Sequence, residues 1–125
     1  MWPDRPPESP LEFSIVVPVF DEEVAVAPLA REIALAFAGE AFEMLFVDDA
    51  SVDGTAASLI ALAPTIPQLR ILSHRRNAGQ SRAIRTGVLA ARAPIVVMLD
   101  GDGQNDPADA PRMARVLRAA PPELG

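Results

Sequence analysis

The stretch FEMLFVDDASVDGT, residues 42–55, decides the fold, because it joins an apolar strand, an acidic loop and the start of a helix. The run from Phe42 to Val47 is typical of a buried strand. Asp48 and Asp49 follow directly at its end, and a short helix is predicted over residues 55–63, before Pro64. A buried strand that leads through a polar loop into a helix is the repeating unit of α/β folds.

The same unit recurs on both sides of this stretch. Strands are predicted over residues 13–20, 42–47, 70–73 and 95–99, and helices over residues 22–38, 55–63, 80–92 and 107–119. Pro18 cannot donate a ladder hydrogen bond, so the first strand should end or lie at an edge near it. Ala83 and Gly87 would let their helix lie close on the sheet. The alternating order predicts a three-layer α/β/α fold with a parallel sheet and helices on both faces.

Composition excludes several kinds of chemistry. The 125 residues contain no Lys, Cys or Tyr, so there is no P-loop lysine, no Schiff base, no thiol nucleophile and no cysteine zinc site. The single histidine, His74, excludes a histidine-rich metal cage. It has no obvious partner, and we expect a structural role for it. Any metal must be held by oxygen, which favours hard cations such as Mg²⁺ or Mn²⁺.

Charge and hydropathy limit the partners and the location. The length suits one domain, and the net charge of −6 argues against nucleic-acid binding. No apolar run approaches the roughly 18–20 residues that a membrane-spanning helix needs. Residues 1–11 are rich in proline, lack a signal-peptide pattern and are predicted to be a flexible lead-in. We therefore expect a cytoplasmic protein.

Polar side chains follow each of the four predicted strands. Ligands of parallel α/β sheets bind beyond the carboxyl ends of the strands. We therefore expect one site built from Asp21 and Glu22, Asp48 and Asp49, residues 74–77, and Asp100 and Asp102.

Each polar cluster also has a simpler interpretation. Asp100 and Asp102 could share a divalent cation or form an ordinary acidic turn, and the buried strand before them favours the cation. Asp48 and Asp49 could accept hydrogen bonds from a nucleobase or ribose, although taken alone they resemble a helix cap with two solvated acids. Residues 75–79 suit a diphosphate at a helix N-terminus and equally a solvated basic loop.

Four segments, taken in order, resemble family 2 glycosyltransferases of the GT-A fold. The likeness is nearest to dolichol-phosphate mannosyltransferases and bacterial polyprenyl-phosphate glycosyltransferases, and it covers about residues 13–119. The matching segments are VPVFDE (17–22), VDDASVDGT (47–55), Arg76-Asn77-x-Gly79 with Ala83 and Gly87, and DGDGQNDP (100–107). Gly103 and Asn105-Asp106 depart from the residues that are frequent in the family, which leaves the sugar open.

The resemblance implies roles for named residues. Pro18, Phe20, Glu22 and Asp49 would contact the nucleoside of a nucleotide-diphospho-sugar, with Asp48 supporting and Arg76 near the diphosphate. Asp100 and Asp102, the catalytic pair, would hold Mg²⁺ or Mn²⁺ together with Gln104. The reaction would be an inverting transfer from GDP-mannose or a UDP-sugar to a polyprenyl or dolichyl phosphate. That acceptor is anionic and needs no general base.

The resemblance also implies a longer enzyme. Family members carry a second half that binds the acceptor, so we expect residues 12–120 to be the nucleotide-sugar-binding half and 121–125 a truncated tail. We expect such a fragment to expose an apolar sheet edge and to self-associate through it. The full enzyme would act at the inner face of the membrane.

Other functions fit the sequence less well. The serious alternative is a non-catalytic nucleotide-binding fragment of such an enzyme. A receiver-like phosphoacceptor domain would place the acidic pair after the first strand and use a lysine, which this chain lacks. A dinucleotide-binding domain would carry a glycine-rich loop after the first strand, and a nucleotidyltransferase would carry one with Arg or Lys. Neither loop is present there.

Overall fold

The computed structural model describes residues 10–99 and the backbone of residues 116–118. Its elements are β1 (Phe13–Val19), α1 (Val26–Ala36), β2 (Phe42–Asp48), α2 (Thr55–Leu62), the 3₁₀ helix η1 (Ala63–Thr65), β3 (Leu69–Ser73), α3 (Gln80–Ala90), β4 (Ile95–Met98) and β5 (Val116–Arg118). The four predicted strands and the first three predicted helices are therefore confirmed, with small shifts at their ends. The largest shift is at the start of α1.

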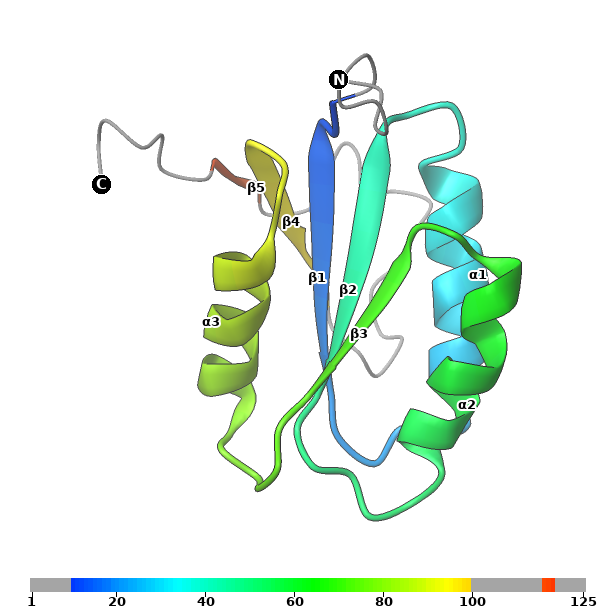
Figure 1. The fold of residues 1–125 in the computed structure, drawn as a ribbon, viewed down its shortest axis with the longest axis vertical. Helices are drawn as coiled ribbons and strands as arrows, with labels where there is room; N and C mark the ends of the chain where they lie inside the picture. Colours follow the sequence, from blue (N-terminus) through cyan, green and yellow to red (C-terminus); the bar gives the residue numbers. More distant parts are fainter. Residues whose placement is uncertain (1–9, 100–115, 119–125) are drawn as a thin grey trace, which may run out of the picture.

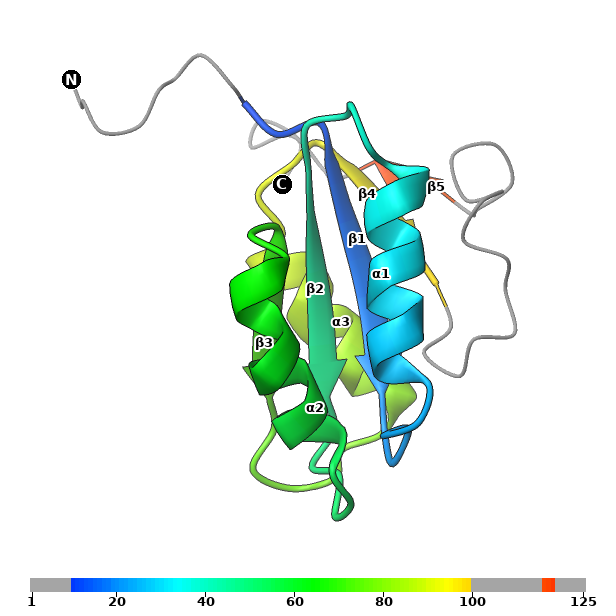
Figure 2. The ribbon, with the colours of Figure 1, turned by 90° about the vertical axis from the view of Figure 1, so that its right-hand side faces the viewer.

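The strands form one sheet in the order β3-β2-β1-β4-β5, with β1 to β4 parallel. Helices α1 and α2 lie side by side on one face and α3 covers the other (Figures 1 and 2). The predicted three-layer α/β/α arrangement is confirmed. Within residues 10–99, no helix is both long and apolar enough to cross a bilayer.

The prediction of a helix over residues 107–119 is wrong at Val116–Arg118. These residues form β5, which pairs antiparallel with β4, so the sheet is mixed rather than wholly parallel. Unpaired backbone groups along β4 can bond a returning strand, and this long-range pairing overrides the local helical pattern. Residues 107–115 lie outside the described part of the chain. Because β5 covers the outer side of β4, the two edge strands of the described sheet are β3 and β5.

Pro18 was expected either to lie near the end of its strand or to lie at an edge of the sheet. It lies in β1, which is an inner strand, so it is not at an edge. Val19 O accepts from Asp49 N on the β2 side, whereas Val16 O accepts from Leu99 N on the β4 side. Since alternate residues face alternate neighbours, Pro18 faces β4, whose pairing ends opposite Val16. The proline ring therefore removes no ladder hydrogen bond to β4. Strand β1 ends one residue later, at Val19, so the expectation that the strand ends near Pro18 is confirmed.

Helix α3 packs unusually close to the sheet at Gly87. A Cβ atom placed there would lie 2.4 Å from Val16 Cγ1 and 3.2 Å from Val47 Cγ2. Gly87, Ala83, Val16 and Val47 are all buried. The predicted role of the two small residues in close helix–sheet packing is confirmed, and it fixes the height of α3 above β1 and β2.

A buried glutamate anchors the other end of α3. Glu43 accepts hydrogen bonds from Arg70 Nη1 at 2.8 Å, Ser14 Oγ at 2.6 Å and Arg92 N at 2.8 Å. Arg70 also donates to Ala90 O at 3.1 Å. The network satisfies both carboxylate oxygens, as a buried charge requires. It holds the C-terminal end of α3 at the amino edge of the sheet, opposite the predicted site.

Candidate functional site

Three loops meet at the carboxyl edge of the sheet, at the lower end of Figure 1. They follow β1, β2 and β3 and comprise residues 20–25, 49–54 and 74–79. The structure brings together the predicted residues Phe20, Glu22, Asp48 and Asp49 here, within hydrogen-bonded loops. The middle loop is bonded to the loops on both of its sides.

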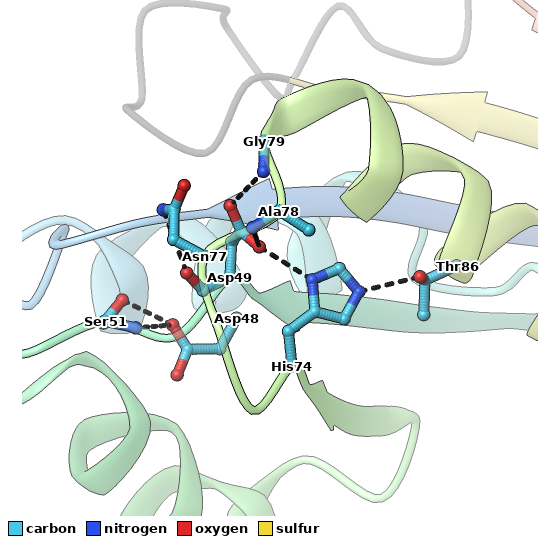
Figure 3. A network of polar contacts seen from close by, with 8 residues as sticks. All are labelled: Asp48, Asp49, Ser51, His74, Asn77, Ala78, Gly79 and Thr86. Carbon is cyan, nitrogen blue, oxygen red and sulfur yellow. Dashed lines mark hydrogen bonds and ion pairs between the residues drawn. The ribbon is translucent and has the colours of Figure 1, made fainter.

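The first link joins the β1 and β2 loops through Asp21 and Ser51. Asp21 N donates to Ser51 Oγ at 2.8 Å, and Asp21 Oδ1 accepts from Val52 N at 2.9 Å. Asp48 Oδ1 in turn accepts from both the N–H and the hydroxyl of Ser51 (Figure 3). Asp48 therefore orients the serine that holds the β1 loop.

A second reciprocal link lies beside the first. Glu23 N donates to Asp53 Oδ2 at 3.3 Å while Gly54 N donates to Glu23 Oε1 at 2.8 Å, and Glu22 N donates to Thr55 Oγ1 at 2.8 Å. Hydrogen bonds, chiefly from the Thr55 hydroxyl, hold the pKa of Asp53 below its ordinary value. These bonds keep residues 22–25 in a turn, so α1 begins at Val26 rather than at residue 22.

Asp49 links the β2 loop to the β3 loop. The Asp49 side chain is 5% exposed, and its Oδ1 accepts from His74 Nδ1 at 2.7 Å and from Ala78 N at 2.8 Å. Oδ2 accepts from Gly79 N at 2.8 Å (Figure 3). Burial is the largest single influence and raises the pKa of Asp49, but the bonds from His74, Ala78 and Gly79 together outweigh it and hold the pKa below its ordinary value.

His74 has the partners that the sequence did not reveal. Its Nε2 lies 2.8 Å from Thr86 Oγ1 on α3, and its backbone N donates to Asp48 O at 2.9 Å. Asn77 Nδ2 also reaches this region, donating to Asp49 O at 3.3 Å. The sequence offered no obvious partner for His74, and the structure supplies these. Thr86 is distant in sequence, so no local pattern could indicate it.

The N-terminus of α3 differs from the anion site that the sequence suggested. Gly79 adopts a φ of +99°, and its N–H and that of Ala78 both bond Asp49. The protein's own carboxylate thus occupies two donors that could have bound a diphosphate. Arg75 and Arg76 are exposed, and within residues 10–99 neither forms an ion pair with Asp48 or Asp49.

The remaining predicted residues differ in accessibility. Phe20 is 45% exposed at the end of β1, and Glu22 is partly buried beside it. Pro18 is buried. An exposed phenyl ring can stack on a planar base, whereas Pro18 can only shape the strand end in this conformation.

The predicted metal ligands Asp100, Asp102 and Gln104 lie outside the described residues. Leu99, which precedes them, donates its N–H to Val16 O at 3.1 Å, so β4 leads to the same carboxyl edge. Across residues 10–99, no group of three or more His, Asp or Glu side chains could hold a metal ion.

The backbone of Ala50 offers a test of local strain. Ala50 has a φ of +65° immediately after the acidic pair. A left-handed conformation costs an L-residue about 1–2 kcal/mol, and glycine avoids this cost. Glycine also gives the unfolded chain more conformational entropy, which lowers the stability of the folded state by about 0.4–1 kcal/mol. We expect Ala50→Gly to raise the free energy of unfolding by about 0.5 kcal/mol in urea denaturation. A loss of stability would mean that the methyl group contributes more than the strain costs.

Residues 14–124 match the family model described as glycosyl transferase family 2. The chain is 38% identical to the dodecaprenyl-phosphate galacturonate synthase of Rhizobium johnstonii, over 89% of this chain and 34% of that protein. It is 32% identical to the dolichol-phosphate mannosyltransferase of Saccharomyces cerevisiae, over 86% of this chain and 41% of that protein. It therefore spans well under half the length of these relatives.

A solved structure shares the fold. The mannosyltransferase PcManGT from Pyrobaculum calidifontis, in complex with GDP-Man and Mn²⁺, superposes with a TM-score of 0.67 at 25% identity. The match covers 79% of this chain and 31% of that protein. The α/β fold described above is thus that of GT-A glycosyltransferases.

Proposed function

The chain belongs to glycosyl transferase family 2, and on this premise we propose that it binds the nucleotide-sugar donor of an inverting glycosyltransferase. The donor would be GDP-mannose or a UDP-sugar. Residues 12–120 would form the donor-binding half of the enzyme.

The observation that carries the proposal is the pair of interlocked loops after β1 and β2. Reciprocal hydrogen bonds between Asp21 and residues 51–52, and between Glu23 and residues 53–54, hold both loops in one arrangement before any ligand arrives. Preorganised loops lower the entropic cost of binding. Binding at the carboxyl ends of parallel strands is the rule for this fold class.

The residues at this edge suit a nucleoside. The exposed ring of Phe20 would stack on the base, and the carboxylates of Glu22 and Asp49 would accept hydrogen bonds from ring N–H or ribose hydroxyl groups. Pro18 would shape the end of β1, and Asp48 would act through Ser51. Arg76 would lie near the diphosphate.

The segment after β4 offers oxygen ligands for a divalent cation. Asp100, Asp102 and Gln104 would hold Mg²⁺ or Mn²⁺, since two carboxylates and an amide form the oxygen donor set that these ions prefer. A bound cation would supply charge stabilisation to the departing nucleoside diphosphate. The relative in complex with GDP-Man and Mn²⁺ supports this choice of cofactor.

The acceptor would be a polyprenyl or dolichyl phosphate, as the names of the relatives suggest. A phosphate oxygen of the acceptor would attack the anomeric carbon, and the bond from that carbon to the donor diphosphate would break with inversion. The acceptor oxygen is already anionic, so no general base is needed. The full enzyme would work at the cytoplasmic face of the membrane, and self-association would involve the open edge of β3.

Thermal unfolding of the chain with nucleotide tests the proposal. We expect GDP or UDP to raise the melting temperature when Mn²⁺ is present, because a ligand at about a hundred times its Kd stabilises the folded state by about 2.7 kcal/mol. In Asp102→Asn the Mn²⁺-dependent part of the shift should disappear. Glu32→Gln, an exposed substitution on α1, should behave like the wild type. A wild-type transition indifferent to both nucleotides would overturn the proposal.

A further inference from the structure

We propose that His74, anchored by Thr86, is a positioning residue that orients Asp49 for the nucleotide. The inference rests on the proposed function, because it concerns how the same site presents one of its acceptors. It gives a defined part to His74, for which the sequence suggested a structural role at this edge, and adds Thr86.

The hydrogen-bond chain has a defined direction. An ionised carboxylate only accepts, so His74 Nδ1 must carry the proton that it shares with Asp49 Oδ1 at 2.7 Å. The other ring nitrogen, Nε2, then faces the Thr86 hydroxyl at 2.8 Å, and that hydroxyl can either donate or accept. Thr86 therefore fixes the plane of the imidazole from the α3 side (Figure 3).

The two oxygens of Asp49 end up unequal. Oδ1 accepts two bonds, from His74 and from Ala78 N, which fills the two acceptor positions of one oxygen. Among residues 10–99, Oδ2 accepts one bond, from Gly79 N, and a second acceptor position of that oxygen takes no donor from this part of the chain. By saturating Oδ1 and fixing the carboxylate plane, His74 directs Oδ2 to receive an N–H or O–H donor of the nucleoside.

The imidazole ring of His74 also connects the Asp49 carboxylate to the loop after β3, residues 74–79. His74 and Gly79 bracket residues 75–78, and both bond the same carboxylate. Turning the carboxylate would break both contacts and release the loop that carries Arg76. One imidazole thus holds the nucleoside acceptor and the loop near the diphosphate in a single arrangement.

Two amide substitutions of His74 separate its two contacts. The amide nitrogen of asparagine can take the place of Nδ1, whereas that of glutamine can take the place of Nε2. We expect His74→Asn to bind GDP or UDP with Mn²⁺ within about threefold of the wild type, and His74→Gln to bind about tenfold more weakly, as for loss of one charge-assisted hydrogen bond. Isothermal titration calorimetry gives the affinities, and the melting temperature of each variant is measured alongside.

Thr86→Val keeps the side-chain volume and tests the anchor by itself. We expect it to weaken nucleotide binding about threefold and to speed amide exchange at Ala78 and Gly79. Thr65→Val removes a hydroxyl that bonds Leu62 O, far from the site, and should change neither quantity. If His74→Gln does not fold, Thr86→Val decides the question.

The outcomes separate the two proposals. Melting temperatures that fall while every nucleotide affinity stays at the wild-type value would mean that His74 is only structural, and the positioning role would be overturned. Equal weakening in His74→Asn and His74→Gln would overturn it too. If the wild type binds neither nucleotide, the proposed function fails first, and the positioning role fails with it.

Discussion

Replacing Gly87 with alanine should destabilise the protein by about 2 kcal/mol. The new Cβ would lie 2.4 Å from Val16 Cγ1, and Val16 is a stiff, fully buried side chain in the central strand. Overpacking of this kind costs about 3 kcal/mol, and the better helix propensity of alanine returns about 1 kcal/mol. Urea denaturation of Gly87→Ala measures the loss, which should lower the melting temperature by roughly 10 °C.

A double-mutant cycle identifies the cause. Val16→Ala alone opens a cavity and should cost about 2 kcal/mol, but together with Gly87→Ala it makes room for the new methyl group, so the two losses should not add. Arg85→Ala, on the exposed side of α3, controls for alanine in this helix and should stay within about 0.5 kcal/mol of the wild type. Additive losses would mean that the clash with Val16 is not the source.

The close approach at Gly87 also has a functional consequence. Helix α3 carries Thr86 beside Gly87 and begins at the loop that bonds Asp49. The Glu43 network fixes the opposite end of the helix. A helix lifted from the sheet at Gly87 would move Thr86 away from His74, so we expect this packing to set the geometry of the site as well as stability.

The sequence predicted the central part of the fold well for a physical reason. Strands β1 and β2 are buried on both faces, and each appears in the sequence as a short, largely apolar run rich in β-branched or aromatic residues. Each run ends where acidic residues begin, which marked the carboxyl edge and placed Asp48 and Asp49 at the site.

What the sequence could not reveal depends on contacts between distant residues. The β5 strand is three residues long and is defined by its pairing with β4, not by a local pattern. No local pattern around Glu43 indicates its partners, because Ser14 and Arg70 lie on other strands. The pairing of His74 with Thr86 is of the same kind, because it depends on how α3 sits on the sheet.

Asp49→Asn should lower stability by about 3 kcal/mol and weaken nucleotide binding at least tenfold. An amide has one acceptor and one donor end, whereas Asp49 accepts from three protein donors. In either orientation of the amide at least one part-buried backbone N–H, of Ala78 or Gly79, faces an NH₂ group. The unpaired donor and the lost charge-assisted bonds together cost about this much. Chemical denaturation and titration with GDP or UDP plus Mn²⁺ measure the two effects.

Asp48→Asn is the matched control, because the neighbouring Asp48 is equally buried but, within residues 10–99, its carboxylate accepts through one oxygen only. Its amide can keep the acceptor end on Ser51 and direct the NH₂ group elsewhere, so the cost should stay below about 1 kcal/mol. Similar losses in both variants would mean that removal of negative charge, and not the three-donor geometry of Asp49, controls stability.

The pH dependence of the Asp49→Asn effect follows from the low pKa of Asp49 in the folded protein. Because the unfolded carboxyl has the higher pKa, near 3.9, its stabilising contribution is complete well above that pH and is lost as the pH falls through the folded-state value. The difference in unfolding free energy between wild type and Asp49→Asn should therefore shrink as the pH falls below about pH 4. Asp53, whose pKa is also lowered, remains in both proteins and does not contribute to this difference. A difference that persisted at low pH would mean that packing of the side chain, not its charge, holds the β3 loop.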